Sequence, residues 1–336
     1  MRFGVVGSGD AGWSFAGAAH FVEGVELIGV AGRTAEKVAK LAEKALTRGF
    51  SFEELLAQKP DVVAIATPPG VHSPQALACL RAGIHVMIEK PMALSVEDCD
   101  RVIGEAQKRG RKIMVTQTWR YRDIIRKARE IIASGRFGTV TNVYLENSHN
   151  YFSSKRSGWQ VDVEMSGGGV TMNPFIHFID TARYLAGAEV TDVRGMVGFH
   201  KEGFEKIEGD VTCVARFANG ATAMICVNGY GQQPSDKTEV YLTQGVLRIN
   251  ATEKRIDAVI NGRVAECYGF GENGLTNAQG IYGHLGYIRH IEEMRDAVEK
   301  GGPISSDGAN GRENVRIARG ILESCGVKMP GPSVTE

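Results

Sequence analysis

The stretch FGVVGSGDAG, residues 3–12, decides the fold of the first part of this chain. A short apolar run leads into three glycines in the order G-x-G-x-x-G. Gly7 allows a tight turn, Gly9 lets the backbone approach a pyrophosphate, and Gly12 allows a helix to pack close to a strand. A helical pattern and a second apolar run follow, as a dinucleotide-binding fold requires. The sequence therefore predicts that nucleotide phosphates contact the loop formed by Gly7, Ser8, Gly9, Asp10, Ala11 and Gly12.

Short apolar runs recur over the first 118 residues, and helical patterns separate them. Runs without polar alternation are typical of strands that are buried on both faces of a parallel sheet. Ser51 with Glu54 predicts a capping box, and Ser95 predicts a second helix N-cap. A doubly wound parallel sheet is expected for this half. Its predicted strands lie at residues 3–6, 25–31, 62–66, 85–88 and 113–115.

The pattern changes after about residue 139, where longer strands begin. Asn219-Gly220 and Asn261-Gly262 each join two such strands and predict hairpins. The fold class is therefore α/β, with a second α/β domain built on a large, mostly antiparallel open sheet. We expect two domains, 1–118 and 119–336, with the boundary in the helix-rich segment 119–138. A closing helix near 312–325 is expected to pack back on the first domain.

The composition indicates a globular protein whose partners are small molecules. Lys+Arg and Asp+Glu number 39 each in 336 residues, so no overall basic charge favours nucleic acid or a membrane surface. No apolar run could span a bilayer and no signal-peptide region follows Met1, so a cytoplasmic location is expected. The cysteines show no paired spacing, which favours reduced thiols in the core over disulfides or metal ligands. These cysteines are Cys79, Cys99, Cys213, Cys226, Cys267 and Cys325.

The stretch GVAGRT, residues 29–34, bears on the choice of cofactor. An NAD site usually carries an acidic residue near this position for the ribose 2′-hydroxyl. Here Arg33 and Thr34 could instead bond a 2′-phosphate, which favours NADP. The alternative is that Arg33 is a solvated arginine that stacks on adenine, which leaves NAD usable.

The stretch HVMIEKPMAL, residues 85–94, places a charged group at the end of a buried strand. Ligands of open parallel sheets lie beyond the carboxyl ends of the strands, so Lys90 is expected to point to the cofactor cleft. Pro91 holds Lys90 in extended geometry. An ammonium there would stabilise the alkoxide that forms during hydride transfer. The alternative is a solvated lysine paired with Glu89.

A third stretch, SGGGVTMNPFIHFIDTARYLAG at residues 166–187, carries polar groups at helical spacing. Three glycines allow a close backbone approach, and Asn173, His177 and Asp180 follow at i, i+4 and i+7 on one predicted helix face. An imidazole titrates near neutrality, so His177 is the candidate general base. The alternative is a structural histidine whose hydrogen bonds are all made within the fold.

Three stretches resemble, in order and spacing, the Gfo/Idh/MocA oxidoreductases, which include glucose-fructose oxidoreductase and inositol dehydrogenase: GVVGSGDAG, VVAIATPPGVHSPQALACLRAGIHVMIEKPMAL and GGGVTMNPFIHFIDTARYLAG. The resemblance implies an N-terminal Rossmann domain, catalytic roles for Lys90 and His177, and hydride transfer between NAD(P) and a carbinol or ketone of a sugar, cyclitol or sugar derivative. It also implies a homodimer or homotetramer that forms through the C-terminal sheet. Positions that match cofactor contacts of the family are Thr67, Pro68, His72, Glu89 and Lys90.

One position departs from the familiar catalytic set, in which an aspartate precedes the histidine by four residues. This chain has Asn173 there. A neutral amide binds a hydroxyl but cannot take its proton, so proton transfer would fall to His177. Two other activities stay open: glycosidic bond cleavage that uses NAD transiently, and nucleotide sensing without catalysis.

The segment NSHNYFSSKRSGW, residues 147–159, is expected to overhang the substrate. An aromatic surface with polar donors suits a sugar ring, and Lys155 with Arg156 could receive an anionic group. The predicted substrate-binding residues are His149, Tyr151, Arg156, Trp159, Asn173 and Tyr282.

Overall fold

The computed structural model describes residues 1–153 and 158–333, which form two compact units. Unit 1 comprises Met1–Thr118, Glu272–Val315 and residues 330–333, and unit 2 comprises Trp119–Gly271 and Arg316–Met329. This division differs from the expected single boundary after residue 118. Glu272–Val315 joins unit 1 because its helix α9 (Leu285–Lys300) contributes Ile288, Ile291 and Met294 to the hydrophobic core around α1 (Asp10–Ala19).

In the described part of unit 1, the main sheet has six parallel strands in the order β3-β2-β1-β4-β5-β6. The strand order reverses on either side of β1, so the crevice for a ligand is expected at the carboxyl ends of β1 and β4. The short edge strand β3 was not predicted, because two residues carry no periodic pattern. The strands are β1 (Arg2–Val6), β2 (Glu26–Ala31), β3 (Gly49–Phe50), β4 (Val62–Ile65), β5 (His85–Glu89) and β6 (Ile113–Thr116).

Helices of unit 1 begin where the sequence predicts caps. Ser51 and Glu54 form the predicted capping box, and the Ser95 hydroxyl accepts the Asp98 N–H at the start of α5, so both predictions are confirmed. A separate two-stranded sheet joins β15 (Gly274–Thr276) to β16 (Tyr282–His284). The other helices are α1 (Asp10–Ala19), α2 (Ala35–Lys44), α3 (Phe52–Ala57), η1 (Pro69–Val71), α4 (His72–Arg81) and α5 (Val96–Arg109).

The described part of unit 2 contains an eight-stranded, mostly antiparallel sheet in the order β14-β13-β12-β11-β7-β10-β9-β8. Only the β7–β10 pair is parallel among these strands. Both predicted hairpins are confirmed, and Gly220, Asn261 and Gly262 take the positive φ angles of tight turns. The strands are β7 (Val140–Asn150), β8 (Val190–Gly198), β9 (Asp210–Phe217), β10 (Thr222–Asn228), β11 (Tyr230–Leu242), β12 (Gly245–Asn250), β13 (Arg255–Ile260) and β14 (Arg263–Gly269).

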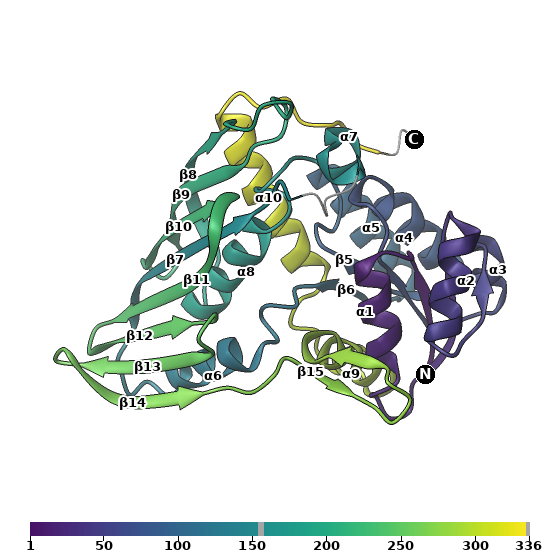
Figure 1. Cartoon of the computed structure of the whole chain (residues 1–336), viewed down its shortest axis with the longest axis horizontal. Helices are drawn as coiled ribbons and strands as arrows, with labels where there is room; N and C mark the ends of the chain where they lie inside the picture. The colour runs from purple at the N-terminus through teal and green to yellow at the C-terminus, as the bar shows by residue number, and fades with distance from the viewer. Residues whose placement is uncertain (154–157, 334–336) are drawn as a thin grey trace. The chain divides into compact units, whose positions relative to one another are not determined.

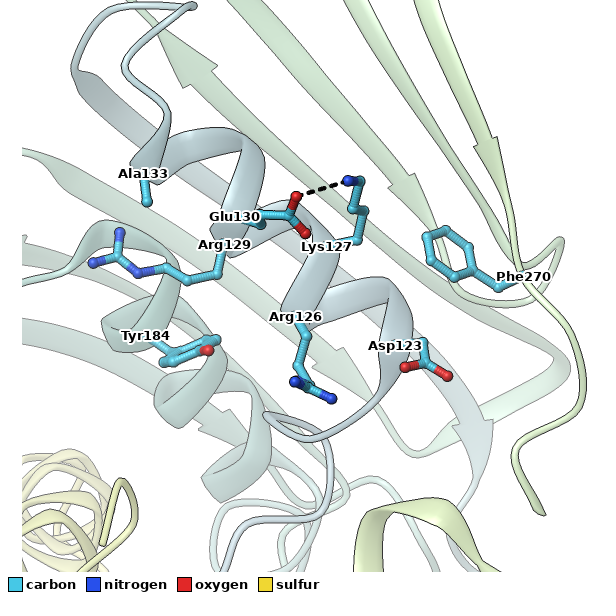
Figure 2. Close-up of a pocket in the computed structure, with 8 residues that line it drawn as sticks. All are labelled: Asp123, Arg126, Lys127, Arg129, Glu130, Ala133, Tyr184 and Phe270. Carbon is cyan, nitrogen blue, oxygen red and sulfur yellow. Dashed lines mark hydrogen bonds and ion pairs between the residues drawn. The ribbon is translucent and has the colours of Figure 1, made fainter. Parts of the chain in front are cut away.

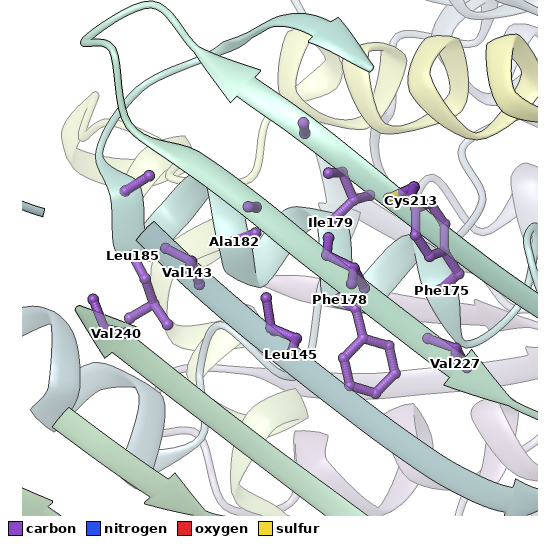
Figure 3. Close-up of a cluster of buried hydrophobic side chains, with 14 of the residues drawn as sticks. Val143, Leu145, Phe175, Phe178, Ile179, Ala182, Leu185, Cys213, Val227 and Val240 are labelled. Carbon is purple, nitrogen blue, oxygen red and sulfur yellow. The ribbon is translucent and has the colours of Figure 1, made fainter. Parts of the chain in front are cut away.

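Helices α6 (Asp123–Ala133) and α8 (Phe175–Ala186) cover one face of this sheet (Figure 1). Phe175, Phe178 and Ile179 of α8 pack on Val143 and Leu145 of β7, and Figure 3 shows this core. Nearly every residue of α8 is buried. The helix is therefore held rigidly, which matters because it carries His177. The two remaining short helices are η2 (Gly158–Val161) and α7 (Val163–Ser166).

Helix α10 (Gly308–Ser324) belongs to both units. In unit 1, the Arg312 guanidinium donates to the Asp100 carboxylate at 3.0 Å, and Gly311 leaves room for Val115. In unit 2, Ile321 packs close to Gly195. The first half of the helix is thus grouped with unit 1 and the second half with unit 2.

The six cysteines are free thiols, but not all of them lie in the core. Cys79, Cys99 and Cys213 are buried, and burial raises the pKa of each thiol to about 12. Cys267 and Cys325 are exposed, because one lies on the edge strand β14 and the other just beyond the end of α10. No described helix has the length and apolar character needed to cross a membrane.

Candidate functional site

In the glycine loop of unit 1, close protein contacts require two of the three glycines, and the third faces open space. A Cβ at Gly7 would clash with the Ala66 carbonyl, and one at Gly12 would clash with the Gly7 carbonyl. A Cβ at Gly9 would meet no protein atom within 4 Å. Gly9 is the N-cap of α1, where backbone N–H groups attract anions. The loop therefore fits the pyrophosphate of a dinucleotide.

Arg33 and Thr34 lie between the carboxyl end of β2 and the start of α2, and both are exposed. Within the described residues, the Arg33 side chain makes no hydrogen bond or ion pair. Thr34 is the N-cap of α2, yet its hydroxyl makes no capping bond. Both side chains are thus free to bind a phosphate, as the NADP prediction requires.

Lys90 directly follows β5, where the sequence places it, and the Lys90–Pro91 peptide bond is cis. The neighbouring Glu89 is 8% exposed and receives the Tyr287 hydroxyl at 2.8 Å. Burial raises the pKa of the Glu89 carboxyl, and the Lys90 charge and the Tyr287 bond oppose the rise. Sequence reasoning missed Tyr287, because it lies 198 residues away in a helix without a motif.

His72 does not present its ring nitrogens to a ligand. The side chain is fully buried, with Nδ1 2.9 Å from the Pro91 carbonyl oxygen and Nε2 2.7 Å from the Thr67 carbonyl oxygen. The Thr67 hydroxyl donates to Gln75 at 2.6 Å, and Pro68 caps the short helix η1. His72 therefore joins the segments that follow β4 and β5, and the cofactor contact predicted for it is not supported by this geometry.

The glycine run at residues 167–169 approaches another part of unit 2. A Cβ at Gly169 would clash with the Glu208 carbonyl, and Gly168 has a φ of +141°. The fully buried Glu208 carboxylate accepts the N–H groups of Gly169 at 2.8 Å and of Thr171 at 2.9 Å. Burial raises the pKa of this carboxyl, and the two N–H groups oppose the rise. Glu208, which the sequence analysis overlooked, fixes the loop that leads to Asn173.

The predicted polar stripe on α8 is only partly present. The helix begins at Phe175, so Asn173 lies in the preceding turn, with its N–H bonded to the Gly169 carbonyl. Pro174 explains this, because proline disfavours helical geometry in the residue before it. Asp180 is buried and accepts two bonds from Arg120, at 2.7 and 3.0 Å. It is a structural ion-pair partner, which leaves His177 as the titratable candidate of the stripe.

His177 is 8% exposed and lies against Trp119, a residue that the sequence analysis also missed. The indole and imidazole planes are parallel, with centroids 5.4 Å apart. A histidine stacked in this way has a defined ring plane, which a proton acceptor needs.

The remaining predicted substrate residues are scattered. His149 lies on β7 with Nδ1 2.8 Å from the Asn147 amide oxygen, and half-buried Trp159 lies in η2. Tyr151 is fully buried in the core, and its contact with substrate stays a prediction. Tyr282 belongs to β16 and is 54% exposed. Arg156, like Lys155, lies outside the described residues.

A cavity of about 580 Å³ along α6, which Tyr184 and Phe270 also line, contains none of the predicted site residues. Figure 2 shows its charged lining, in which Lys127 donates to Glu130 at 2.9 Å. Arg129 packs over Gly187 at the C-terminus of α8, where a cation stabilises the helix dipole. Lys127, Glu130 and Arg129 thus have local structural explanations, so Lys90 in unit 1 and His177 in unit 2 remain the candidate residues.

Family models match both parts of the chain. The model described as "Oxidoreductase family, NAD-binding Rossmann fold" (GFO_IDH_MocA) matches residues 1–117, and the GFO/IDH/MocA C-terminal domain model matches residues 125–248. The chain belongs to the GFO/IDH/MocA family. The resemblance read from the sequence is confirmed. As a member of this family the protein is an oxidoreductase with an NAD-binding Rossmann domain.

Individual relatives of this chain are named for different ring compounds. A 1-carboxy-3-chloro-3,4-dihydroxycyclohexa-1,5-diene dehydrogenase of Comamonas testosteroni is 31% identical over 74% of this chain and 66% of its own length. Myo-inositol 2-dehydrogenase of Thermotoga maritima is 26% identical over 93% of this chain and 92% of its own. A levoglucosan dehydrogenase solved with NADH and levoglucosan has a TM-score of 0.85 at 21% identity, over 97% of both chains. At that identity the likeness shows the fold alone.

Proposed function

We propose that the protein is an NAD(P)-dependent dehydrogenase that transfers hydride between nicotinamide and a carbinol or ketone of a sugar, a cyclitol or a related ring compound. The observation that carries the proposal is Lys90, which follows β5 at the same edge of the parallel sheet as the Gly7–Gly12 loop. Bound nicotinamide would accept or donate the hydride. The chain's own residues would bind the substrate and manage its proton.

The proposed catalytic residues are Lys90 and His177. In the oxidation direction, His177 takes the proton of the reacting hydroxyl, and the Lys90 ammonium stabilises the negative charge that develops on oxygen. The Asn173 amide binds a substrate hydroxyl but does not exchange a proton with it. His149 and Trp159 are proposed to contribute polar and aromatic contacts to the substrate ring.

NADP is the proposed cofactor, with NAD as the alternative. The exposed Arg33 has no ionic partner in the described residues, and the N-terminus of α2 beside it favours a bound anion. The other proposed cofactor contacts are the backbone and side chains of residues 7–12, with Thr34, Thr67, Pro68 and Glu89.

The name of one relative favours a substrate that carries a carboxylate. The Comamonas enzyme is named for a cyclic diol that bears a carboxyl group. Rings with vicinal hydroxyls and a carboxylate therefore belong in the substrate panel beside neutral sugars and cyclitols.

The deciding experiment follows the absorbance of reduced nicotinamide with NADP and NAD against this panel, in both redox directions. Net cofactor turnover with at least one ring alcohol or ketone supports a dehydrogenase. Release of a sugar from a glycoside with no net change in the cofactor would replace the proposal with redox-assisted bond cleavage. Nucleotide binding without any turnover across the panel would indicate a sensor.

A further inference from the structure

Trp119 lies in the turn between β6 and α6 and stacks on His177. The two ring planes are parallel and their centroids lie 5.4 Å apart, which is the offset arrangement that aromatic rings prefer. The indole is half-buried and packs against the core of unit 2. The contact joins residues that no local sequence pattern connects.

Three elements of unit 2 hold the indole in place. Phe178 of α8 meets it edge-on, with centroids 4.5 Å apart. The Arg122 guanidinium lies 4.0 Å from the indole centroid, and its Nη1 donates to Asp236 of β11 at 3.2 Å. The Arg122 N–H donates to the Trp119 carbonyl at 3.1 Å, which closes the turn. Contacts to the indole ring and a hydrogen bond to the Trp119 backbone therefore fix the position of this side chain together.

The backbone of His177 is also fixed, because its N–H bonds to Pro174 and its carbonyl accepts the Thr181 hydroxyl at 2.8 Å. Rotation of the imidazole about its two side-chain bonds decides where its ring nitrogens point. Small errors in the placement of a reacting group cost large factors in rate. The parallel indole restricts this rotation.

We propose that Trp119 is a positioning residue that sets the ring plane of His177, an inference that rests on the proposed role of His177 as the base. Trp119→Leu removes the flat surface and should lower kcat about tenfold, with KM for substrate and cofactor changed less than about threefold. Trp119→Phe keeps an aromatic face and should restore kcat to within about threefold of the unaltered protein. Phe217→Leu, in the same core but away from the stack, controls for general loosening and should leave kcat unchanged.

A double-mutant cycle separates action through His177 from direct contact with substrate. In a His177→Ala background, Trp119→Leu should cause no further loss of kcat. A further loss of tenfold there would overturn the positioning role, because Trp119 would then act without the imidazole.

A second measurement does not depend on turnover. In protein labelled with ¹³C-histidine, the His177 ring signal, assigned by its loss in His177→Ala, should lie upfield because of the indole ring current. Trp119→Leu should move it downfield, and Phe217→Leu should not. An unmoved signal in Trp119→Leu would overturn the inference whatever the activity. If Trp119→Leu moves the signal but His177→Ala keeps full activity, the proposed function is refuted, while the Trp119–His177 stack is still supported.

Discussion

Arg33 carries the cofactor preference at the level of a single side chain. It is exposed at the end of β2 and has no ionic partner among the described residues. A hydrogen bond to a charged group contributes about 1.5 to 3 kcal/mol, so Arg33→Ala should weaken NADP binding roughly tenfold to a hundredfold and barely change NAD binding. Titration calorimetry with both cofactors measures the difference. Equal losses of affinity for NADP and NAD would show that Arg33 does not bind the 2′-phosphate.

His177 and Lys90 carry the proposed chemistry. His177→Ala should lower turnover by about 10²- to 10⁴-fold with cofactor affinity nearly intact, as expected when a general base is lost. Lys90→Ala should also reduce turnover, because a developing oxyanion would lose its cationic partner. Steady-state rates with the best substrate of the panel, and separate cofactor titrations, check both variants. Unaltered turnover in Lys90→Ala would make this lysine structural.

The lowered pKa of His85 predicts that the stability of the folded protein depends on pH. Burial, with Arg111 and Lys112 nearby, lowers its pKa from 6.5 to about 4. The unfolded chain therefore binds a proton at this residue between those pH values and the folded chain does not, so the free energy of unfolding falls as pH drops from 6.5 to 4.

His85→Gln removes this titration and keeps an acceptor for the Lys112 N–H, which His85 Nδ1 receives at 2.8 Å. From pH 7 to pH 5, the unaltered protein should lose about 1 kcal/mol more stability than His85→Gln, since partial exposure screens the full effect. Urea unfolding at both pH values measures the two losses. Equal losses of stability in the unaltered protein and in His85→Gln would refute the assignment of this pH dependence to His85.

At the scale of elements, the loop between α7 and α8 depends on an acceptor from a distant segment. Glu208 precedes β9, and its buried carboxylate receives the N–H groups of Gly169 and Thr171. The Glu208 carbonyl also accepts the Val170 N–H at 3.0 Å. Because these bonds lie just before Asn173 and α8, the carboxylate is expected to stabilise the loop and the start of the helix together.

Glu208→Ala should destabilise unit 2 by about 3 kcal/mol, because it leaves buried N–H groups without an acceptor. Glu208→Gln keeps one acceptor oxygen and should cost less. Urea unfolding, with hydrogen exchange of the Gly169 and Thr171 amides, checks the prediction. Unchanged exchange at these two amides in Glu208→Ala would show that the carboxylate does not hold the loop.

At the scale of the whole molecule, the uncovered face of the large sheet is the expected surface for self-association. A row of neighbouring side chains crosses six strands there, and Val214 and Met224 in it are 53% and 41% exposed. Exposed apolar side chains on an open sheet face are typical of subunit interfaces. The row is Arg194, Val214, Met224, Tyr144, Glu239 and Arg248.

We therefore predict a homodimer or homotetramer that Val214→Asp converts to smaller species, because the charge would be buried without a partner. Leu46→Lys, at an apolar residue of unit 1 that is 65% exposed, should not change the mass. Light scattering after gel filtration measures both. A monomeric unaltered protein would refute the prediction outright.

The sequence by itself determined the features that depend on a few neighbouring residues. The buried strands around residues 3–6 and 85–88, the cap at Ser51 and the hairpin turn at Asn261-Gly262 all follow from local spacing and backbone preference. The glycine loop and the place of Lys90 at a strand end follow in the same way. These features also carried the family resemblance, because its motifs are short and contiguous.

Tertiary structure alone decided which distant residues the candidate side chains and loops contact. Glu89 meets Tyr287 from 198 residues away, Asp180 meets Arg120 from 60, and Gly169 meets Glu208 from 39. The physical reason is that a hydrogen bond or a ring stack needs only proximity in the folded chain, and such proximity leaves no periodic trace in the segments that it joins. For the same reason the Trp119–His177 stack became visible only once α8 and the turn before α6 were packed on one sheet.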